Sequence, residues 1–107
     1  MSDAIEWPEP WTPVKADVAS RLEAELQREL PPGHVLAGVR VMAIAHRIDQ
    51  DEVGFRLTDG PGAFAIVHLS YQVERDPRWP DTDVFATASD LNRQVQEDHV
   101  AYSAPHN

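Results

Sequence analysis

The chain has 107 residues, a formal net charge of −9 and no cysteine. This length is typical of one domain, because about 100 to 200 residues usually share a single hydrophobic core. The lack of cysteine excludes disulfides, thiolate metal sites and cysteine nucleophiles. The acidic balance argues against partners that are nucleic acids or anionic membranes, because both require basic side chains on the protein.

The N-terminal residues have neither the basic start nor the apolar stretch of a signal peptide. No apolar run is longer than the one at residues 41–45, which is far too short to cross a membrane. From these features and the absence of cysteine, we expect a cytoplasmic protein.

The first predicted element is a helix that follows a proline-rich segment. Residues 1–12 are expected to be an extended lead-in, since proline fixes φ and restricts the residue before it. Thr12 is a suitable N-cap and Pro13 a suitable first helical residue. An apolar residue then recurs every four positions, which predicts a helix that ends at Leu30; the recurring residues are Val14, Val18, Leu22, Leu26 and Leu30.

Strands are predicted in the middle of the chain. Residues 35–48 carry apolar side chains at both parities, which suggests a strand covered on both faces. Residues 53–57 alternate between apolar and polar, as in a half-buried strand. The Asp-Gly-Pro-Gly run at 59–62 predicts a turn that closes a hairpin onto residues 63–71. In the returning strand, one face is expected to carry Phe64, Ile66, His68 and Ser70, and the other Ala65, Val67, Leu69 and Tyr71.

A short strand at 84–86 and a second helix complete the prediction. Thr87 and Asp90 have the spacing of a capping box, and Leu91 and Val95 supply an apolar helix face. Residues 103–107 are expected to be a frayed tail. The sequence therefore predicts a single α+β domain over residues 1–107, with a three- to four-stranded antiparallel meander flanked by an N-terminal and a C-terminal helix.

No residue pattern indicates a catalytic or metal site. His46 and His68 lie on predicted strands and would approach one another if those strands were neighbours. However, no third ligand has a diagnostic spacing, so we expect no metal and no cofactor. Ser70 is close to His68 in sequence but lacks the Gly-x-Ser-x-Gly motif, and we expect no catalytic residue.

The loop at residues 76–80 is the segment most suited to binding. Pro77 and Pro80 bracket Arg78 and Trp79. The prolines stiffen the loop, so it would lose little entropy on binding, and Trp and Arg are frequent anchors of protein interfaces. The structural alternative is that Trp79 covers one end of the sheet while Arg78 pairs with a nearby carboxylate, that of Asp76, Asp81 or Asp83.

One stretch of the chain resembles a known group of proteins. The run from His68 to Tyr71, followed by Glu74, Asp76-Pro77, Trp79-Pro80 and Thr82, is similar to a pattern in short uncharacterised bacterial proteins. In that group, a strand ending in a His-Leu-Thr-Trp-like sequence precedes a Trp-Pro loop. The resemblance covers about residues 53–89, with Ser70 and Tyr71 in place of the Thr and Trp. It implies the local fold and no activity.

These observations favour a non-enzymatic acidic domain that acts through protein contacts. The predicted binding residues are Trp79, Arg78, Asp76, Tyr71 and His68. The expected partner is a protein with a basic surface, attracted by electrostatic complementarity. One alternative is a small-ligand or catalytic domain, with a sheet–helix cleft near His68, Tyr71, Arg78 and Trp79. Another is a homodimer formed through a sheet edge.

Overall fold

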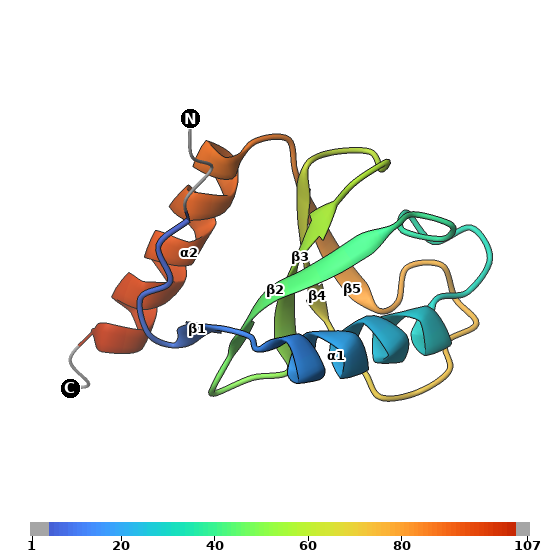
Figure 1. The fold of residues 1–107 in the computed structure, drawn as a ribbon, viewed down its shortest axis with the longest axis horizontal. Helices are drawn as coiled ribbons and strands as arrows, with labels where there is room; N and C mark the ends of the chain where they lie inside the picture. Colours follow the sequence, from blue (N-terminus) through green and yellow to red (C-terminus); the bar gives the residue numbers. More distant parts are fainter. Residues whose placement is uncertain (1–4, 105–107) are drawn as a thin grey trace.

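A computed structural model describes residues 5–104, which form two helices and one five-stranded sheet (Figure 1). All neighbouring strands are antiparallel, and they follow one another in sequence order, β1-β2-β3-β4-β5. The predicted α+β class and the two flanking helices are confirmed. In chain order the elements are β1 (Trp11–Pro13), α1 (Ala16–Glu29), β2 (Val41–Arg47), β3 (Glu52–Leu57), β4 (Phe64–His68), β5 (Asp81–Phe85) and α2 (Ala88–Ser103).

The additional strand is β1, which lies in the segment predicted as lead-in and helix start. Trp11 pairs with Arg47, and Pro13 pairs with Ala45. The helix begins only at Ala16, so the prediction of a cap at Thr12 was wrong. The physical reason is that Thr12 pairs with His46 in the sheet and therefore cannot cap a helix. Pro13 is tolerated there because an edge strand has one row of N–H groups that needs no partner.

Residues 35–40, predicted as the start of a strand, form a chain of turns before β2. The N–H of Ala37 donates to the carbonyl of His34, and that of Val39 to the carbonyl of Leu36. Gly38 has a φ of 78°, which side-chain-bearing residues rarely adopt. The apolar alternation was misleading here, because Leu36 lies in a turn and its side chain is buried although it is not part of a strand.

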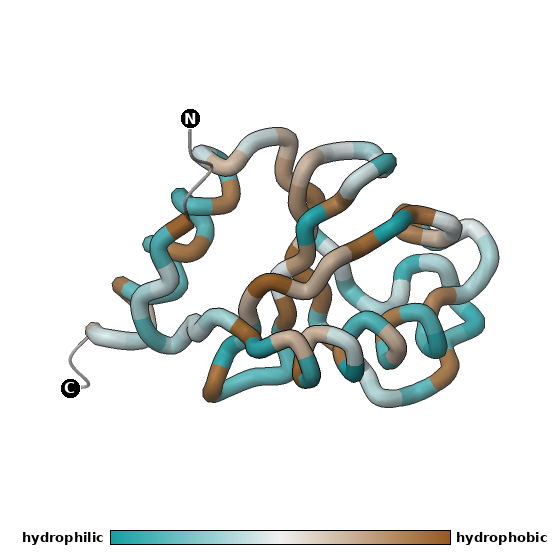
Figure 2. The backbone as a smooth tube through the Cα atoms, viewed as in Figure 1, coloured by the Kyte–Doolittle hydropathy of each residue, from teal (hydrophilic) through white to brown (hydrophobic). Residues whose placement is uncertain are grey.

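The sheet separates two cores, and each helix covers one face (Figure 1). The hydrophobic residues concentrate along the strands, as the hydropathy colouring shows (Figure 2). The core under α1 contains Leu26, Phe55, Ala65 and Val67, among others. The core under α2 contains Trp11, Phe64, Ile66, Leu91 and Val95, among others. The predicted two-sided alternation of β4 is therefore confirmed.

Two features of the sheet lie next to the α2 core. A register shift between Ala43 and Ala45 turns the first toward the α1 core and the second toward the α2 core. Gly54 lies on the α2 face of the sheet, where a Cβ would make ordinary contacts of 3.5 Å with the Trp7 ring and 3.8 Å with the Trp11 ring. The N-terminal arm thus packs its indole rings against the sheet beside α2.

Helix α2 begins as predicted but extends further. The Thr87 hydroxyl accepts a hydrogen bond from the Asp90 N–H, which confirms the cap. The helix continues to Ser103, the first residue of the predicted tail, and residues 105–107 of that tail lie outside the described residues. Within residues 5–104, no helix has the length and apolar content needed to cross a bilayer.

Candidate functional site

The segment from residue 69 to 80, here called the anchored loop, connects β4 to β5 and is fixed at its start by Glu29. One carboxylate oxygen of Glu29 accepts from the Ser70 N–H at 2.9 Å and from the Ser70 hydroxyl at 3.1 Å. The other oxygen accepts from the Tyr71 N–H at 2.8 Å. In addition, the Glu29 carbonyl accepts from the Glu74 N–H at 3.2 Å. One residue at the end of α1 therefore holds four donors of the loop.

Glu29 is fully buried, which changes its acidity. Burial, together with a hydrogen bond to the Glu25 side chain, raises the pKa of Glu29 from 4.5 to about 7, against the opposing effect of the donors at Ser70 and Tyr71. By contrast, Arg28 lies 2.7 Å from Glu25 and lowers the pKa of that carboxyl. The carboxyl group that holds the loop thus titrates near neutral pH.

The end of the anchored loop is fixed by His34. This side chain is buried, and its Nδ1 accepts from the Leu36 N–H at 3.0 Å. Nε2 therefore carries the proton of the neutral ring and donates to the Pro80 carbonyl at 2.9 Å. Thr82 donates to the same carbonyl at 3.0 Å. Two buried polar side chains, Glu29 and His34, thus hold the two ends of one irregular segment.

Between these anchors, the loop presents the predicted Arg–Trp pair. The Arg78 guanidinium binds both carboxylate oxygens of Asp76, the shortest contact being 2.7 Å, and the Arg78 N–H donates to Asp76 at 2.9 Å. The Arg78 side chain lowers the pKa of Asp76 to about 2. Trp79 is 49% exposed, so its ring is not a buried lid. The loop thus has one feature of each alternative, because Arg78 pairs with Asp76 while Trp79 is half-exposed to solvent.

Tyr71 belongs to a separate cleft. Its φ is 58°, in the left-handed region that non-glycine residues seldom occupy, and its N–H is held by Glu29. The cleft has a volume of about 380 Å³ between α1, β2 and the anchored loop. It is lined by Val18, Arg21, Leu22, Glu25, His46 and Tyr71. The Tyr71 cleft thus combines polar groups of three elements with an apolar floor.

His68 lies at a third location. It is exposed at the end of β4, where it pairs with Glu52 on one side and Asp81 on the other. His46 is two strands away and lines the cleft on the α1 side, whereas the parity of β4 places His68 on the α2 side. The expectation that the two histidines approach one another was therefore wrong, and residues 5–104 contain no cluster of three potential metal ligands.

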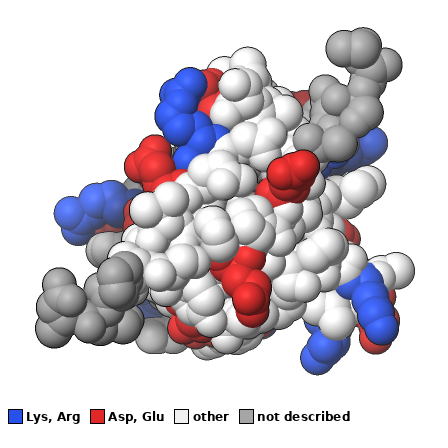
Figure 3. Space-filling view, turned by 90° about the vertical axis from the view of Figure 1, so that its left-hand side faces the viewer, with Lys and Arg blue, Asp and Glu red and all other residues white. Residues whose placement is uncertain are grey.

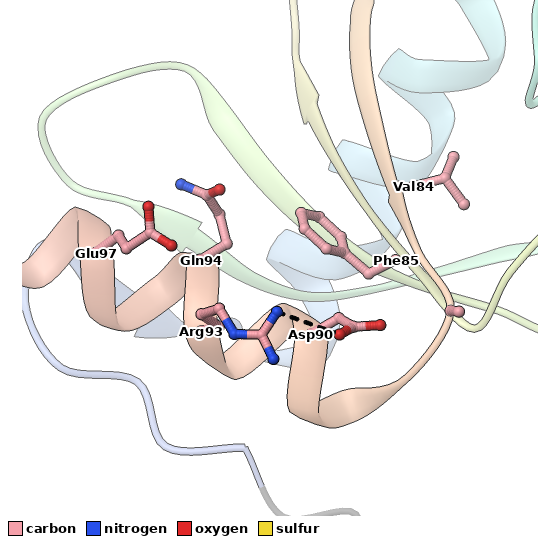
Figure 4. A pocket seen from close by; sticks show the side chains of 7 residues that line it. Val84, Phe85, Asp90, Arg93, Gln94 and Glu97 are labelled. Carbon is pink, nitrogen blue, oxygen red and sulfur yellow. Dashed lines mark ion pairs between the residues drawn. The ribbon is translucent and has the colours of Figure 1, made fainter.

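A further groove, of about 400 Å³, lies between the end of β5 and α2 (Figure 4). Phe85 and Gln94 lie on its two sides, whereas Val84 points away from α2. Arg93 lies 3.6 Å from Asp90 and forms an ion pair with it, drawn as a dashed line. The groove thus has an aromatic side on the strand and a charged side on the helix.

The acidic side chains do not merge into one patch on the α2 side of the molecule. Figure 3 shows this face, on which separate acidic side chains lie within a broad surface that carries no charge, while basic side chains lie at its rim. On this face, the acidic side chains therefore act at individual positions and do not form one acidic patch.

The five predicted binding residues fall into three places. Asp76, Arg78 and Trp79 lie together on the anchored loop, while Tyr71 and His68 lie at sites of their own. Comparisons with family models, curated proteins and solved structures give no match.

Sequence reasoning missed the two anchors, Glu29 and His34. The available signal for Glu29 was its position three residues after Leu26 on the apolar face of α1, where a carboxylate requires a partner. His34 gave no comparable signal, because its partner, the Pro80 carbonyl, is 46 residues away in the chain.

Proposed function

We propose that this chain is a non-enzymatic cytoplasmic domain that binds a protein partner with a basic surface through the anchored loop. One observation carries the proposal: Trp79 is 49% exposed on an irregular loop whose two ends are hydrogen-bonded to buried side chains. The resemblance of residues 53–89 to a group of short bacterial proteins is part of the same proposal.

Pre-organisation is the physical advantage of such a loop. Ordering a flexible loop costs free energy on binding, and a loop already fixed by Glu29 and His34 avoids most of that cost. Tryptophan is the residue type most enriched among interface hot spots. Arg78 is neutralised by Asp76, and Arg75 is an exposed cation four residues before Trp79. The charges that follow Trp79 in the chain are the exposed carboxylates of Asp81 and Asp83. These charges favour a basic partner.

Replacing Trp79 by alanine should weaken binding strongly without unfolding the domain. A phage-displayed random peptide library is selected on the immobilised wild-type domain and is expected to be enriched in lysine and arginine. The affinity of the selected peptides should fall by about tenfold or more in Trp79→Ala, the size of effect expected of a hot spot. The free energy of unfolding should change by less than about 1 kcal/mol, because half of the ring is already in water.

Tyr102→Ala provides the matched control, since Tyr102 is 42% exposed at the end of α2, on a different element. This variant should bind the selected peptides as the wild type does. Selected peptides without basic residues, or equal affinities for wild type and Trp79→Ala, would contradict the proposal.

The Tyr71 cleft supports a second candidate function, the binding of a small ligand. Arg21, Glu25, His46 and Tyr71 converge there on about 380 Å³, a volume within the range of ligand pockets. In a fragment screen followed by amide chemical shifts, ligands of this cleft should shift His46 and Tyr71 and leave Trp79 unchanged. Fragments that shift only Trp79, or no residue of the domain, would count against this candidate.

A further inference from the structure

Strand β5 leaves one edge of the sheet open. Among the described residues, β5 is the last strand and pairs with β4 alone. In an antiparallel ladder, the backbone groups of successive residues point alternately to the two sides of a strand. The Phe85 carbonyl accepts from Ala63 on the β4 side, so the backbone groups of Thr82 and Val84 point to the open side. An additional strand could pair with them.

The side chains of this edge have a clear polarity. Phe85 pairs with Phe64, and Asp83 pairs with Ile66, and both partners belong to the core under α2. Asp81, two residues before Asp83 in the strand, has the same orientation. Asp81 and Asp83 are exposed. The α2 side of the open edge therefore carries two carboxylates followed by one aromatic ring, at every second residue of β5.

We propose that this edge binds an extended segment of the partner as a sixth strand. In this arrangement, two lysine or arginine side chains lie opposite Asp81 and Asp83, and an apolar side chain enters the groove beside Phe85. Strand addition supplies main-chain hydrogen bonds, while the alternate side chains supply specificity. The inference rests on the proposed function, because it describes the shape and sequence pattern of the same basic partner.

The same charges disfavour a second copy of the chain at this edge. Antiparallel pairing of two β5 strands centred on Asp83 would place that carboxylate opposite itself, and pairing centred on Thr82 would place Asp81 opposite Asp83. Like charges directly opposite one another destabilise a strand pair. Trp79 precedes β5 by two residues, so a segment that runs along β5 also reaches the anchored loop. The edge and the loop thus fit one basic partner better than a homodimer.

A pair of synthetic peptides tests the inference. Leu-Thr-Lys-Thr-Lys, laid antiparallel to β5, places its leucine opposite Phe85 and its lysines opposite Asp83 and Asp81. Titration into the labelled domain should shift the amides of Thr82 and Val84 and slow their hydrogen exchange. Leu-Thr-Glu-Thr-Glu should bind at least tenfold more weakly. Equal affinities, or shifts confined to other parts of the domain, would overturn the inference.

Charge reversal at the edge supplies the second test. The double variant Asp81→Lys and Asp83→Lys should weaken binding of the lysine peptide at least tenfold, with circular dichroism unchanged because both side chains are exposed. The control, Glu9→Lys with Asp17→Lys, makes the same change in net charge at exposed positions elsewhere, and should alter affinity less than twofold. Equal weakening in both variants would refute the edge site. Library peptides that require Trp79 but tolerate the edge reversal would also refute it, and would leave binding through Trp79 intact.

Discussion

Replacing Glu29 by alanine is expected to lower the free energy of unfolding by about 3 kcal/mol at mildly acidic pH, since each buried group left without its partner costs about 1–3 kcal/mol. The substitution removes the acceptor of the Ser70 and Tyr71 N–H groups and leaves a cavity at the end of α1. Urea unfolding followed by circular dichroism measures the loss. Amide hydrogen exchange at residues 70 and 71 should accelerate, because the start of the anchored loop is released.

The conservative variant Glu29→Gln separates hydrogen bonding from charge. The folded-state pKa of Glu29, about 7, is above its unfolded value of 4.5. The stability that the protonated Glu29 carboxyl contributes is therefore fully present below about pH 4.5 and is lost as pH rises to about 7. By linkage, this difference amounts to about 3 kcal/mol. Wild type should thus lose stability relative to Glu29→Gln as pH rises through this window, because glutamine does not ionise.

Two results would contradict this account of Glu29. One is a Glu29→Ala variant that unfolds within about 0.5 kcal/mol of wild type, the range of ordinary surface substitutions. The other is a stability difference between wild type and Glu29→Gln that does not change between pH 5 and 8. Either would mean that the carboxyl group is solvated and does not hold the loop.

The Trp11→Ala substitution is expected to cost about 3–5 kcal/mol, as is usual when a buried aromatic side chain is truncated. Trp11 is 2% exposed in the core under α2, and its indole N–H donates to Asp98 at 3.0 Å. Asp98 also lies 3.7 Å from Arg47, so the ring connects β1, β2 and α2. Because domains of this kind are stable by only about 5–15 kcal/mol, the variant should be close to unfolding at physiological temperature.

Trp79→Ala is the matched control for this prediction, because it makes the same chemical change at a half-exposed position. Its midpoint in urea should remain near that of wild type, whereas that of Trp11→Ala should fall sharply. Similar midpoints for the two variants would show that the N-terminal arm does not contribute to the core as described.

The local hairpin was predictable from the sequence because its signals are local. The alternation in residues 63–71 and the turn residues at 59–62 fix both faces of β4 without reference to the remainder of the chain. The cap at Thr87 is equally local, since donor and acceptor are three residues apart. The ion pair between Arg78 and Asp76 was one of the alternatives that the sequence offered, because the two residues are two positions apart. The exposure of Trp79 was left open by the sequence.

The remaining features depend on contacts between distant residues. Strand β1 forms because Trp11 finds a partner in Arg47, and this pairing overrides the capping signal at Thr12. The anchors of the loop are likewise remote, since Glu29 and Tyr71 are 42 residues apart. A sequence pattern shows that a carboxylate occupies an apolar helix face, but not which N–H groups it will meet.

The most direct test of the central claim is the mobility of the anchored loop in the free domain. Nitrogen-15 relaxation at the backbone amides of Tyr71, Glu74 and Trp79 reports motion on the picosecond to nanosecond timescale. A loop held by Glu29 and His34 should give order parameters of about 0.85, as in rigid backbone. Values below about 0.6 would show a flexible loop and would contradict a pre-organised binding surface.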